Sequence, residues 1–240
     1  MTEWFEQWFG EEYLRLYPHR DDEDARQAVA LVDGAVPLPG LLVLDLACGA
    51  GRHAAQLTAR GARVVGLDLS MALLLAAKQR LPPPRALVRG DMRSLPFRAG
   101  VFDLVVNLFT SFGYFSDDSQ HQVALAEAAG ALKPGGALVL DYFQANAVRA
   151  GLVPREERMV GDQRVVIQRS ISGDGRFVNK EMQLTGDGRR FSERVRLFSP
   201  AELERMITAT GLRVRQRFGA YDRRPLGEGA PRAIFVAAHD

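Results

Sequence analysis

Three aspartates recur at equal spacing in the first half of the chain, each at or just after the end of an apolar run. They are Asp45, Asp68 and Asp91, so 23 residues separate each from the next. Glycines follow the first acid at positions 49 and 51, where they let the backbone turn sharply and approach a ligand. A helix that begins after such a loop offers free backbone amides. The pattern therefore predicts a binding site with backbone donors and a row of carboxylate acceptors.

Two classes of ligand fit this pattern. Residues 49–54 read Gly-x-Gly-x-x-Ala, a dinucleotide motif, and Asp68 lies 17 residues past Gly51, near the place of a ribose-binding acid. A nicotinamide-dependent oxidoreductase is therefore one hypothesis. Asp45 favours another ligand, because an acid directly before the loop repels a pyrophosphate and attracts a positively charged amino group. A ligand with such a group, a ribose diol for Asp68 and an adenine amine for Asp91 is the second hypothesis.

Short apolar strands alternating with amphipathic segments must position these acids. This alternation is typical of a parallel βαβ arrangement. The expected strands cover residues 41–46, 63–68, 85–91, 101–109, 136–143, 212–219 and 232–238, and the expected helices 52–60, 70–80, 118–132 and 199–211. The sequence thus predicts an α/β fold with a doubly wound, Rossmann-like, mostly parallel seven-stranded sheet. Such sheets bind ligands at their carboxyl edge.

The segment 151–198 has a different rhythm, with polar and apolar residues in alternation. Runs at 164–171, 176–184 and 189–198 are separated by Gly-Asp-Gly turns, which indicates antiparallel hairpins. We interpret the segment as an insertion in one domain of residues 1–240. Because it starts at the carboxyl edge, it is expected to form a lid over a substrate; an oligomer interface is the alternative. All three acids precede it, so we expect the cofactor to bind without it.

Composition excludes several classes of protein. The chain has 240 residues, 47% of them hydrophobic and 25% charged, and a net charge of +2, with no apolar run long enough to cross a membrane. The arginines are dispersed, so we expect no nucleic-acid or membrane partner and a monomer or homodimer. One cysteine, Cys48, and four scattered histidines predict neither a disulfide nor a metal site. The N-terminus does not resemble a signal peptide, so the expected location is cytoplasmic.

Several motifs together resemble the class I S-adenosylmethionine-dependent methyltransferases. They are VLDLACGAGRH, GLDLS, RGDMRSLPF, FDLVVNLFTSFGYF and LKPGGALVLDYF, within residues 43–143. The tail from Phe198 to Asp240 is similar to the last helix and antiparallel strands of that fold. Ala47 departs from the family pattern, which often has glycine there. The SFGYF stretch and the hairpin insertion are similar to the branch that contains sugar N,N-dimethyltransferases.

The resemblance implies a set of residues for S-adenosylmethionine. Asp45, Ala47, Gly49 and Gly51 form the loop beside the methionine part, Asp68 binds the ribose, and Asp91 with Met92 holds the adenine. Leu69 and Met71 cover the adenine face, and Asn107, Leu108 and Phe109 end the strand beneath the sulfonium. Tyr17 and Arg20 match a tyrosine and an arginine that reach the methionine carboxylate. Packing within a helix is an equal alternative for Tyr17.

The acceptor implied by the resemblance is a nitrogen or oxygen of a small molecule. Residues 107–110 read Asn-Leu-Phe-Thr and not the Asn/Asp-Pro-Pro-Tyr type used for bases, which argues against a nucleic-acid acceptor. Methyl transfer needs no protein nucleophile, and no catalytic residue is assigned. Tyr114, Tyr142 and Tyr221 are the expected substrate-binding residues, and with His121 they are the candidates for a general base. A non-catalytic S-adenosylmethionine binder remains an alternative.

Overall fold

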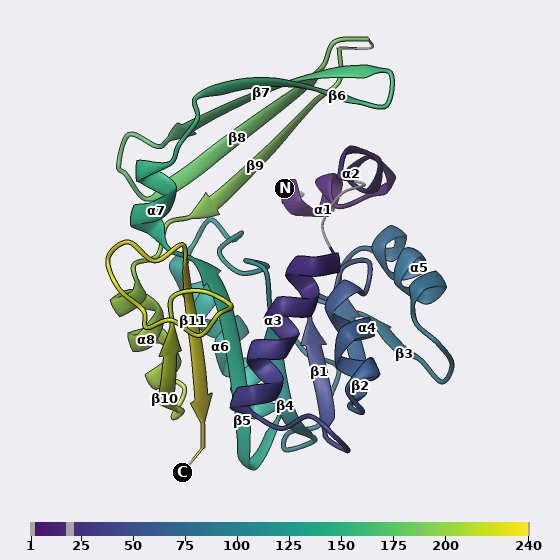
Figure 1. Cartoon of the computed structure of the whole chain (residues 1–240), viewed down its shortest axis with the longest axis vertical. Coiled ribbons are helices and arrows are strands. Elements are labelled where there is room, and N and C mark those ends of the chain that lie inside the picture. Colours follow the sequence, from purple (N-terminus) through teal and green to yellow (C-terminus); the bar gives the residue numbers. More distant parts are fainter. Residues whose placement is uncertain (1–2, 18–21, 187, 240) are drawn as a thin grey trace.

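Five adjacent parallel strands form one side of a seven-stranded sheet, as the alternating segments predict, and two further strands complete its other edge (Figure 1). The computed structural model describes residues 3–17, 22–186 and 188–239. The strands of this sheet are β1 (Leu42–Leu46), β2 (Arg63–Asp68), β3 (Ala86–Arg89), β4 (Phe102–Asn107), β5 (Leu132–Phe143), β10 (Arg213–Phe218) and β11 (Arg232–Ala238). Their order is β10-β11-β5-β4-β1-β2-β3, with β11 antiparallel to both neighbours. The predicted fold class is confirmed.

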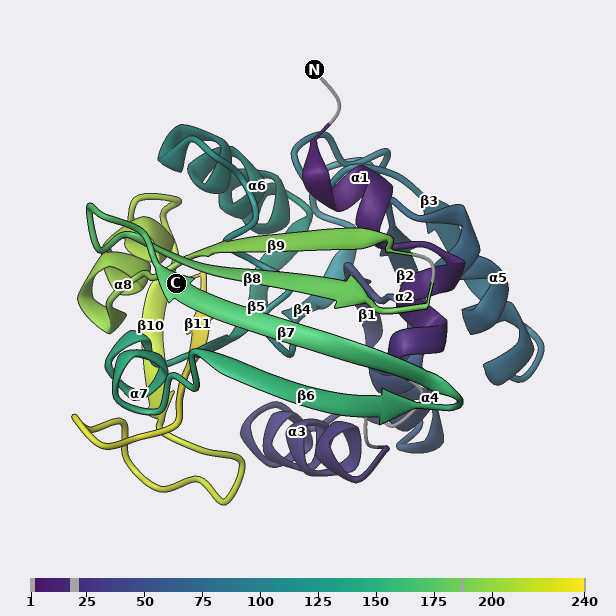
Figure 2. The same ribbon diagram turned by 90° about the horizontal axis from the view of Figure 1, so that it is seen from above.

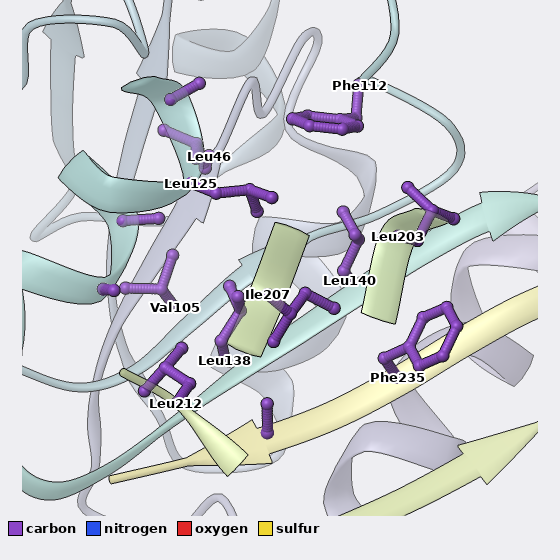
Figure 3. Packing of buried hydrophobic residues seen from close by; sticks show 14 of the residues in the cluster. Leu46, Val105, Phe112, Leu125, Leu138, Leu140, Leu203, Ile207, Leu212 and Phe235 are labelled. Atoms are coloured by element: carbon purple, nitrogen blue, oxygen red, sulfur yellow. The ribbon is translucent and has the colours of Figure 1, made fainter. Parts of the chain in front are cut away.

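Helices cover both faces of the sheet, as in a doubly wound fold. α3 (Asp22–Ala35), α4 (Arg52–Ala59) and α5 (Met71–Arg80) lie over one face, and α6 (Asp118–Gly130) and α8 (Pro200–Thr208) over the other (Figure 1). Figure 3 shows the core beneath α6 and α8, where Leu125, Leu203 and Ile207 pack onto strand residues such as Leu138 and Phe235. No helix in the described part of the chain is both long and apolar enough to cross a membrane.

A second, four-stranded antiparallel sheet lies above the carboxyl edge (Figures 1 and 2). Its strands are β6 (Arg155–Val160), β7 (Gln163–Ile171), β8 (Phe177–Leu184) and β9 (Arg190–Arg196), which follow α7 (Ala145–Ala150). We call it the upper sheet. Three of its strands correspond to the predicted runs. The predicted runs do not include β6, although its residues alternate between half-buried and exposed as theirs do.

Two short N-terminal helices, also absent from the sequence analysis, lie between the two sheets (Figure 1). They are α1 (Trp4–Trp8) and α2 (Glu11–Leu16). Trp8, Tyr13 and Leu16 pack in one apolar cluster with Val165, Ile167, Met182 and Leu184 of the upper sheet. Helices of five and six residues are too short to be stable alone, so this packing must hold them.

Buried Arg196 anchors the upper sheet to the rest of the fold. The residue is 5% exposed. Its guanidinium pairs with Asp118 of α6 at 3.1 Å and with Glu202 of α8 at 3.2 Å. Its backbone amide donates to the Gly113 carbonyl, and its own carbonyl accepts from the Tyr142 hydroxyl. One end of β9 is therefore fixed to α6, α8, β5 and the 111–115 loop.

His121, on α6, is fully buried among aromatic rings. Phe112, Phe115 and Phe198 lie with ring centroids 4.9–5.1 Å away, and neither ring nitrogen has a hydrogen-bond partner in the described structure. Burial lowers the pKa of His121 to about 4. The folded protein therefore takes up this proton less readily than the unfolded chain, whose histidine titrates near 6.5.

We expect acid to destabilise the fold through His121. The stability that depends on a neutral His121 ring is complete above pH 6.5. It is lost between pH 6.5 and 4, because the unfolded chain binds the proton first, and the free energy of unfolding falls by about 3 kcal/mol. Urea unfolding between pH 7.5 and 4.5 measures this slope. In His121→Leu that part of the slope should disappear, whereas the control His239→Asn should keep it. An identical slope in His121→Leu would contradict the assignment.

Candidate functional site

The loop after β1 has the left-handed backbone that its glycines predict. The angle φ is +59° at Ala47, +55° at Gly49 and +77° at Gly51. Alanine in this region costs about 1–2 kcal/mol, which explains why a glycine would suit position 47. The loop is fixed to the end of β2, because the Gly49 amide donates to Asp68 Oδ2 at 2.8 Å.

The two loop glycines have different roles. A Cβ on Gly49 would meet nothing closer than Leu73 Cδ1 at 4.0 Å, since Gly49 faces a cavity. A Cβ on Gly51 would lie 3.0 Å from Ala77 Cβ, so this glycine lets α4 pack closely on α5. Gly51 is not among the described residues that line the cavity.

A cavity of about 550 Å³ lies over this loop at the carboxyl edge. The structure brings eleven of the predicted residues to its wall: Tyr17, Ala47, Gly49, Asp68, Leu69, Met71, Asp91, Met92, Leu108, Phe109 and Tyr114. The remaining wall includes residues that the sequence analysis did not assign, above all Phe5, Phe9 and Tyr13 from α1 and α2. We call this space the lower cavity.

Asp68 combines burial with free acceptor capacity. It is 8% exposed, and its oxygens accept from the amides of Gly49 and Ser70, each at 2.8 Å. A carboxylate has about four lone-pair sites, so positions remain for hydroxyl groups in the cavity. Burial raises the pKa of Asp68, although these amides oppose the change.

Asp45 lies beneath the loop and not in the cavity wall. It is 1% exposed, and its Oδ2 has no hydrogen-bond partner among the described residues. Burial first, and then the charge of Asp68, raise the pKa of Asp45 to about 7. Asp45 is therefore not placed for direct contact with a ligand in the cavity.

Asp91 reaches the cavity from just beyond β3, which ends at Arg89, earlier than predicted. Arg93 Nε donates to both of its oxygens at 3.0 Å. Burial opposes ionisation of Asp91, but these hydrogen bonds outweigh it and lower its pKa. Asp91 is thus an ionised acceptor already shared with Arg93.

Two further predictions fall outside the wall. Asn107 is buried and donates to the Leu46 carbonyl at 2.9 Å, which ties β4 to β1. Arg20 lies outside the described residues. The described wall of the lower cavity therefore contains Leu108 and Phe109, which follow β4, but not Asn107 or Arg20.

A second cavity, of about 540 Å³, lies beneath the upper sheet. We call it the upper cavity. Phe9, Phe109 and Tyr114 line both cavities, so the two spaces meet at these three rings. Its wall also contains two ion pairs from the upper sheet, Glu156 with Arg169 at 3.0 Å and Glu193 with Lys180 at 3.5 Å.

Tyr114 is the one of three predicted substrate tyrosines that the described cavity walls include. Its ring centroid lies 5.2 Å from that of Trp4 and 5.5 Å from that of Phe9. Tyr142 is fully buried in the core, where burial raises its pKa far above normal. Tyr221 donates to Asp141 at 2.8 Å. The spacing of these tyrosines in the sequence does not show which of them faces a cavity.

A strained turn follows β4 where the cavities meet. Phe109 and Thr110 both have left-handed backbones, with φ of +59° and +61°. Such angles are unusual for bulky or β-branched residues and cost about 1–3 kcal/mol each. Surrounding contacts must therefore hold this turn.

The described residues contain no group of three or more histidines, cysteines or acids that could hold a metal ion. The lower cavity instead offers backbone amides, carboxylates and aromatic rings. These groups suit an organic ligand with hydroxyl and amino groups.

Comparison with known proteins agrees with this geometry. Residues 43–136 match the family described as "Methyltransferase domain". The chain is 36% identical over 203 residues to the dTDP-3-amino-3,4,6-trideoxy-alpha-D-glucopyranose N,N-dimethyltransferase of Streptomyces venezuelae, covering 79% of this chain and 82% of that protein. It is 32% identical over 204 residues to the cypemycin N-terminal methyltransferase of a Streptomyces species, with 82% of each covered.

A solved structure shows the same fold over the whole length. The CcbJ methyltransferase from Streptomyces caelestis superimposes with a TM-score of 0.82 and covers 98% of this chain and 99% of that one. Its sequence is 21% identical. This likeness includes the upper sheet and the N-terminal helices, because the coverage leaves almost no residue unmatched.

The two loop glycines should respond differently to alanine. Gly51→Ala should lower the free energy of unfolding by about 2–4 kcal/mol, because backbone strain adds to a clash with Ala77. Gly49→Ala should cost only about 1–2 kcal/mol, because its methyl group enters open space. Denaturant unfolding of both variants measures the difference, and equal losses would contradict the distinction.

Proposed function

Because the chain belongs to the class I S-adenosylmethionine-dependent methyltransferases, we propose that it methylates the amino nitrogen of an amino sugar. Family membership favours methyl transfer over the nicotinamide hypothesis. The Streptomyces venezuelae relative is named as an N,N-dimethyltransferase of an amino sugar, and a similar solved structure is named as a sugar N-methyltransferase. Nitrogen is therefore the acceptor atom with the broader support.

One observation carries the proposal: two cavities of similar volume meet at Phe9, Phe109 and Tyr114. Direct displacement needs the donor and acceptor in line and free of water, and such positioning is worth on the order of 7–11 kcal/mol. We assign the lower cavity to the cofactor and the upper cavity to the acceptor. The methyl group would then pass between the three rings.

The residues of the lower cavity suit S-adenosylmethionine, which when bound supplies a methyl group on a positively charged sulfur. Asp68 would hold the ribose hydroxyls with its remaining acceptor sites. Asp91 and the Met92 backbone would hold the adenine, and Leu69 and half-exposed Met71 would cover its face. Phe9 and Phe109 present aromatic faces that attract a cation, an effect of about 0.5–2 kcal/mol.

The upper cavity suits a polyhydroxylated amine. Trp4, Phe9 and Phe143 in its wall would pack against the face of a sugar ring. Glu156 and Glu193, which pair with Arg169 and Lys180, bring carboxylates to the same wall. Carboxylates accept from ammonium and hydroxyl groups alike. A volume of about 540 Å³ is within the range of small-molecule sites, which favours a sugar over a long peptide.

Tyr114 is the hydroxyl-bearing residue that we assign to the acceptor nitrogen. Its ring is held by Trp4, whose indole nitrogen donates to the Tyr114 carbonyl at 3.3 Å. A hydroxyl at this junction can accept a hydrogen bond from the incoming amine and direct its lone pair toward the methyl carbon. This role needs geometry and not a change in the charge of Tyr114.

Incubation with S-adenosylmethionine and a panel of amines tests the proposal. The panel should contain dTDP-linked 3-amino deoxysugars, free amino sugars, their hydroxyl analogues and a peptide with a free N-terminus. Mass spectrometry should detect one or two methyl groups on an amino sugar. Methylation of the peptide or of a hydroxyl analogue in place of every amino sugar would refute the proposal.

Tyr114→Phe should lower kcat by about 10- to 100-fold, because the acceptor loses its orienting hydroxyl. Binding of S-adenosylhomocysteine, measured by calorimetry, should change little. Tyr142→Phe is the matched control, since its buried hydroxyl donates to the Arg196 carbonyl and lines neither described cavity: kcat should stay unchanged, while stability falls by about 1 kcal/mol. A Tyr114→Phe enzyme with full activity would exclude this role.

The upper sheet belongs to this proposal as the roof of the acceptor site. Val178, Lys180, Glu193 and Val195 of β8 and β9 line the upper cavity, which supports the lid interpretation of residues 151–198. A cytoplasmic monomer or homodimer without nucleic-acid or membrane partners stays a prediction. So does the treatment of residues 1–240 as one domain.

A further inference from the structure

Asp141, on β5, is a buried acid that the reaction itself does not require. It is 0% exposed, yet four groups bind it. Its Oδ2 accepts from the Phe109 amide at 2.9 Å and from the Tyr221 hydroxyl at 2.8 Å. Its Oδ1 accepts from Arg232 Nε, and its backbone carbonyl accepts from the Thr110 amide at 3.0 Å. Both amides come from the strained turn.

Arg232 and Thr110 complete the same network. Arg232 Nη2 donates to Thr110 Oγ1 at 3.2 Å, and that oxygen also accepts from the Phe143 amide at 3.1 Å. Both left-handed residues are thus bound through their backbone amides, and one also through its side chain. The partners come from β5, β11 and the segment after β10, more than 30 residues away in sequence.

We propose that Asp141, Arg232 and Tyr221 are positioning residues that hold the Phe109–Thr110 turn in its left-handed conformation. The turn places the Phe109 ring in the wall shared by both cavities. Two guanidinium carbons lie over this ring, that of Arg52 at 4.9 Å and that of Arg232 at 5.7 Å from its centroid. Release of the turn would move the ring away from the path between donor and acceptor. The inference rests on the proposed methyl transfer.

Burial makes the partners of Asp141 necessary. An acid without exposure is stable as a charge only when it is paired and hydrogen-bonded, and Arg232 supplies both. Tyr221 adds a neutral donor, and burial and the charge of Asp141 raise the pKa of its hydroxyl, which keeps the proton on the tyrosine. Removal of one of these three side chains leaves the polar groups of the others buried without a hydrogen-bond partner.

Asp141→Asn tests the proposal, with Asp103→Asn as the matched control. Asp103, on β4 near the opposite end of the sheet, likewise accepts from a backbone amide (Leu42, 2.8 Å) and a cation (Lys133, 2.6 Å). Hydrogen exchange of the 107–112 segment needs no substrate. We expect it to accelerate at least tenfold in Asp141→Asn and to stay unchanged in Asp103→Asn.

Kinetics supply the second readout. In Asp141→Asn, kcat should fall 10- to 100-fold while the affinity for S-adenosylhomocysteine stays within threefold. Thr110→Gly added to Asp141→Asn should recover at least threefold in kcat, because glycine adopts a positive φ without strain. Recovery distinguishes a held turn from a general loss of structure.

Several outcomes would overturn the proposal. Unchanged exchange at 107–112 in folded Asp141→Asn is one, and a loss of kcat that Thr110→Gly does not recover is another. If Asp141→Asn does not fold, Tyr221→Phe decides instead: exchange at 107–112 should rise about threefold, and no rise refutes the network. If wild type methylates no amine, the exchange experiment still tests the turn, so the two proposals fail separately.

Discussion

The hydrogen bonds of Asp68 fix the geometry on which the site depends. By accepting from Gly49 after β1 and Ser70 after β2, one carboxylate joins the loop of the first strand to the helix that follows the second. Loop, acid and cavity therefore form one unit. Burial makes this carboxylate costly, and the two amides offset that cost while they leave acceptor sites for a ligand.

The sequence predicted this half of the site well because it is local. The strand ends, the glycine loop and the acids at 45, 68 and 91 lie within one stretch whose periodicity is strong, and nine of the eleven predicted residues that line the lower cavity fall between Ala47 and Phe109. The differences here concern the direction in which a residue faces: Asp45 is buried beneath the loop, and Gly51 faces Ala77 of α5. Spacing along a strand or loop alone does not give that direction.

The other half was not predictable in the same way, because it is built from distant segments. α1 and α2 carry no independent helix signal, and their aromatic residues are positioned by contact with distant segments: Trp8 and Tyr13 pack on the upper sheet, and Phe5 packs on Phe115. Tyr114, Tyr142 and Tyr221 are equivalent as residue types, yet one lines both cavities, one fills the core and one binds Asp141. Tertiary packing decides between such positions, and periodicity does not report it.

The same packing changes how the upper sheet should be understood. Glu193 of β9 accepts from Trp8 Nε1 at 2.9 Å and from the Tyr17 hydroxyl at 3.2 Å, so the roof of one cavity is bonded to residues of the N-terminal segment that closes the other. The acids before Asn107 consequently do not enclose the lower cavity by themselves, and binding of the cofactor without residues 151–198 stays a prediction. Loss of the upper sheet would expose the apolar side of α1 and α2 and open the lower cavity with it. The walls of the two cavities therefore depend on each other, through contacts between one segment that precedes the parallel strands in the sequence and one that follows them.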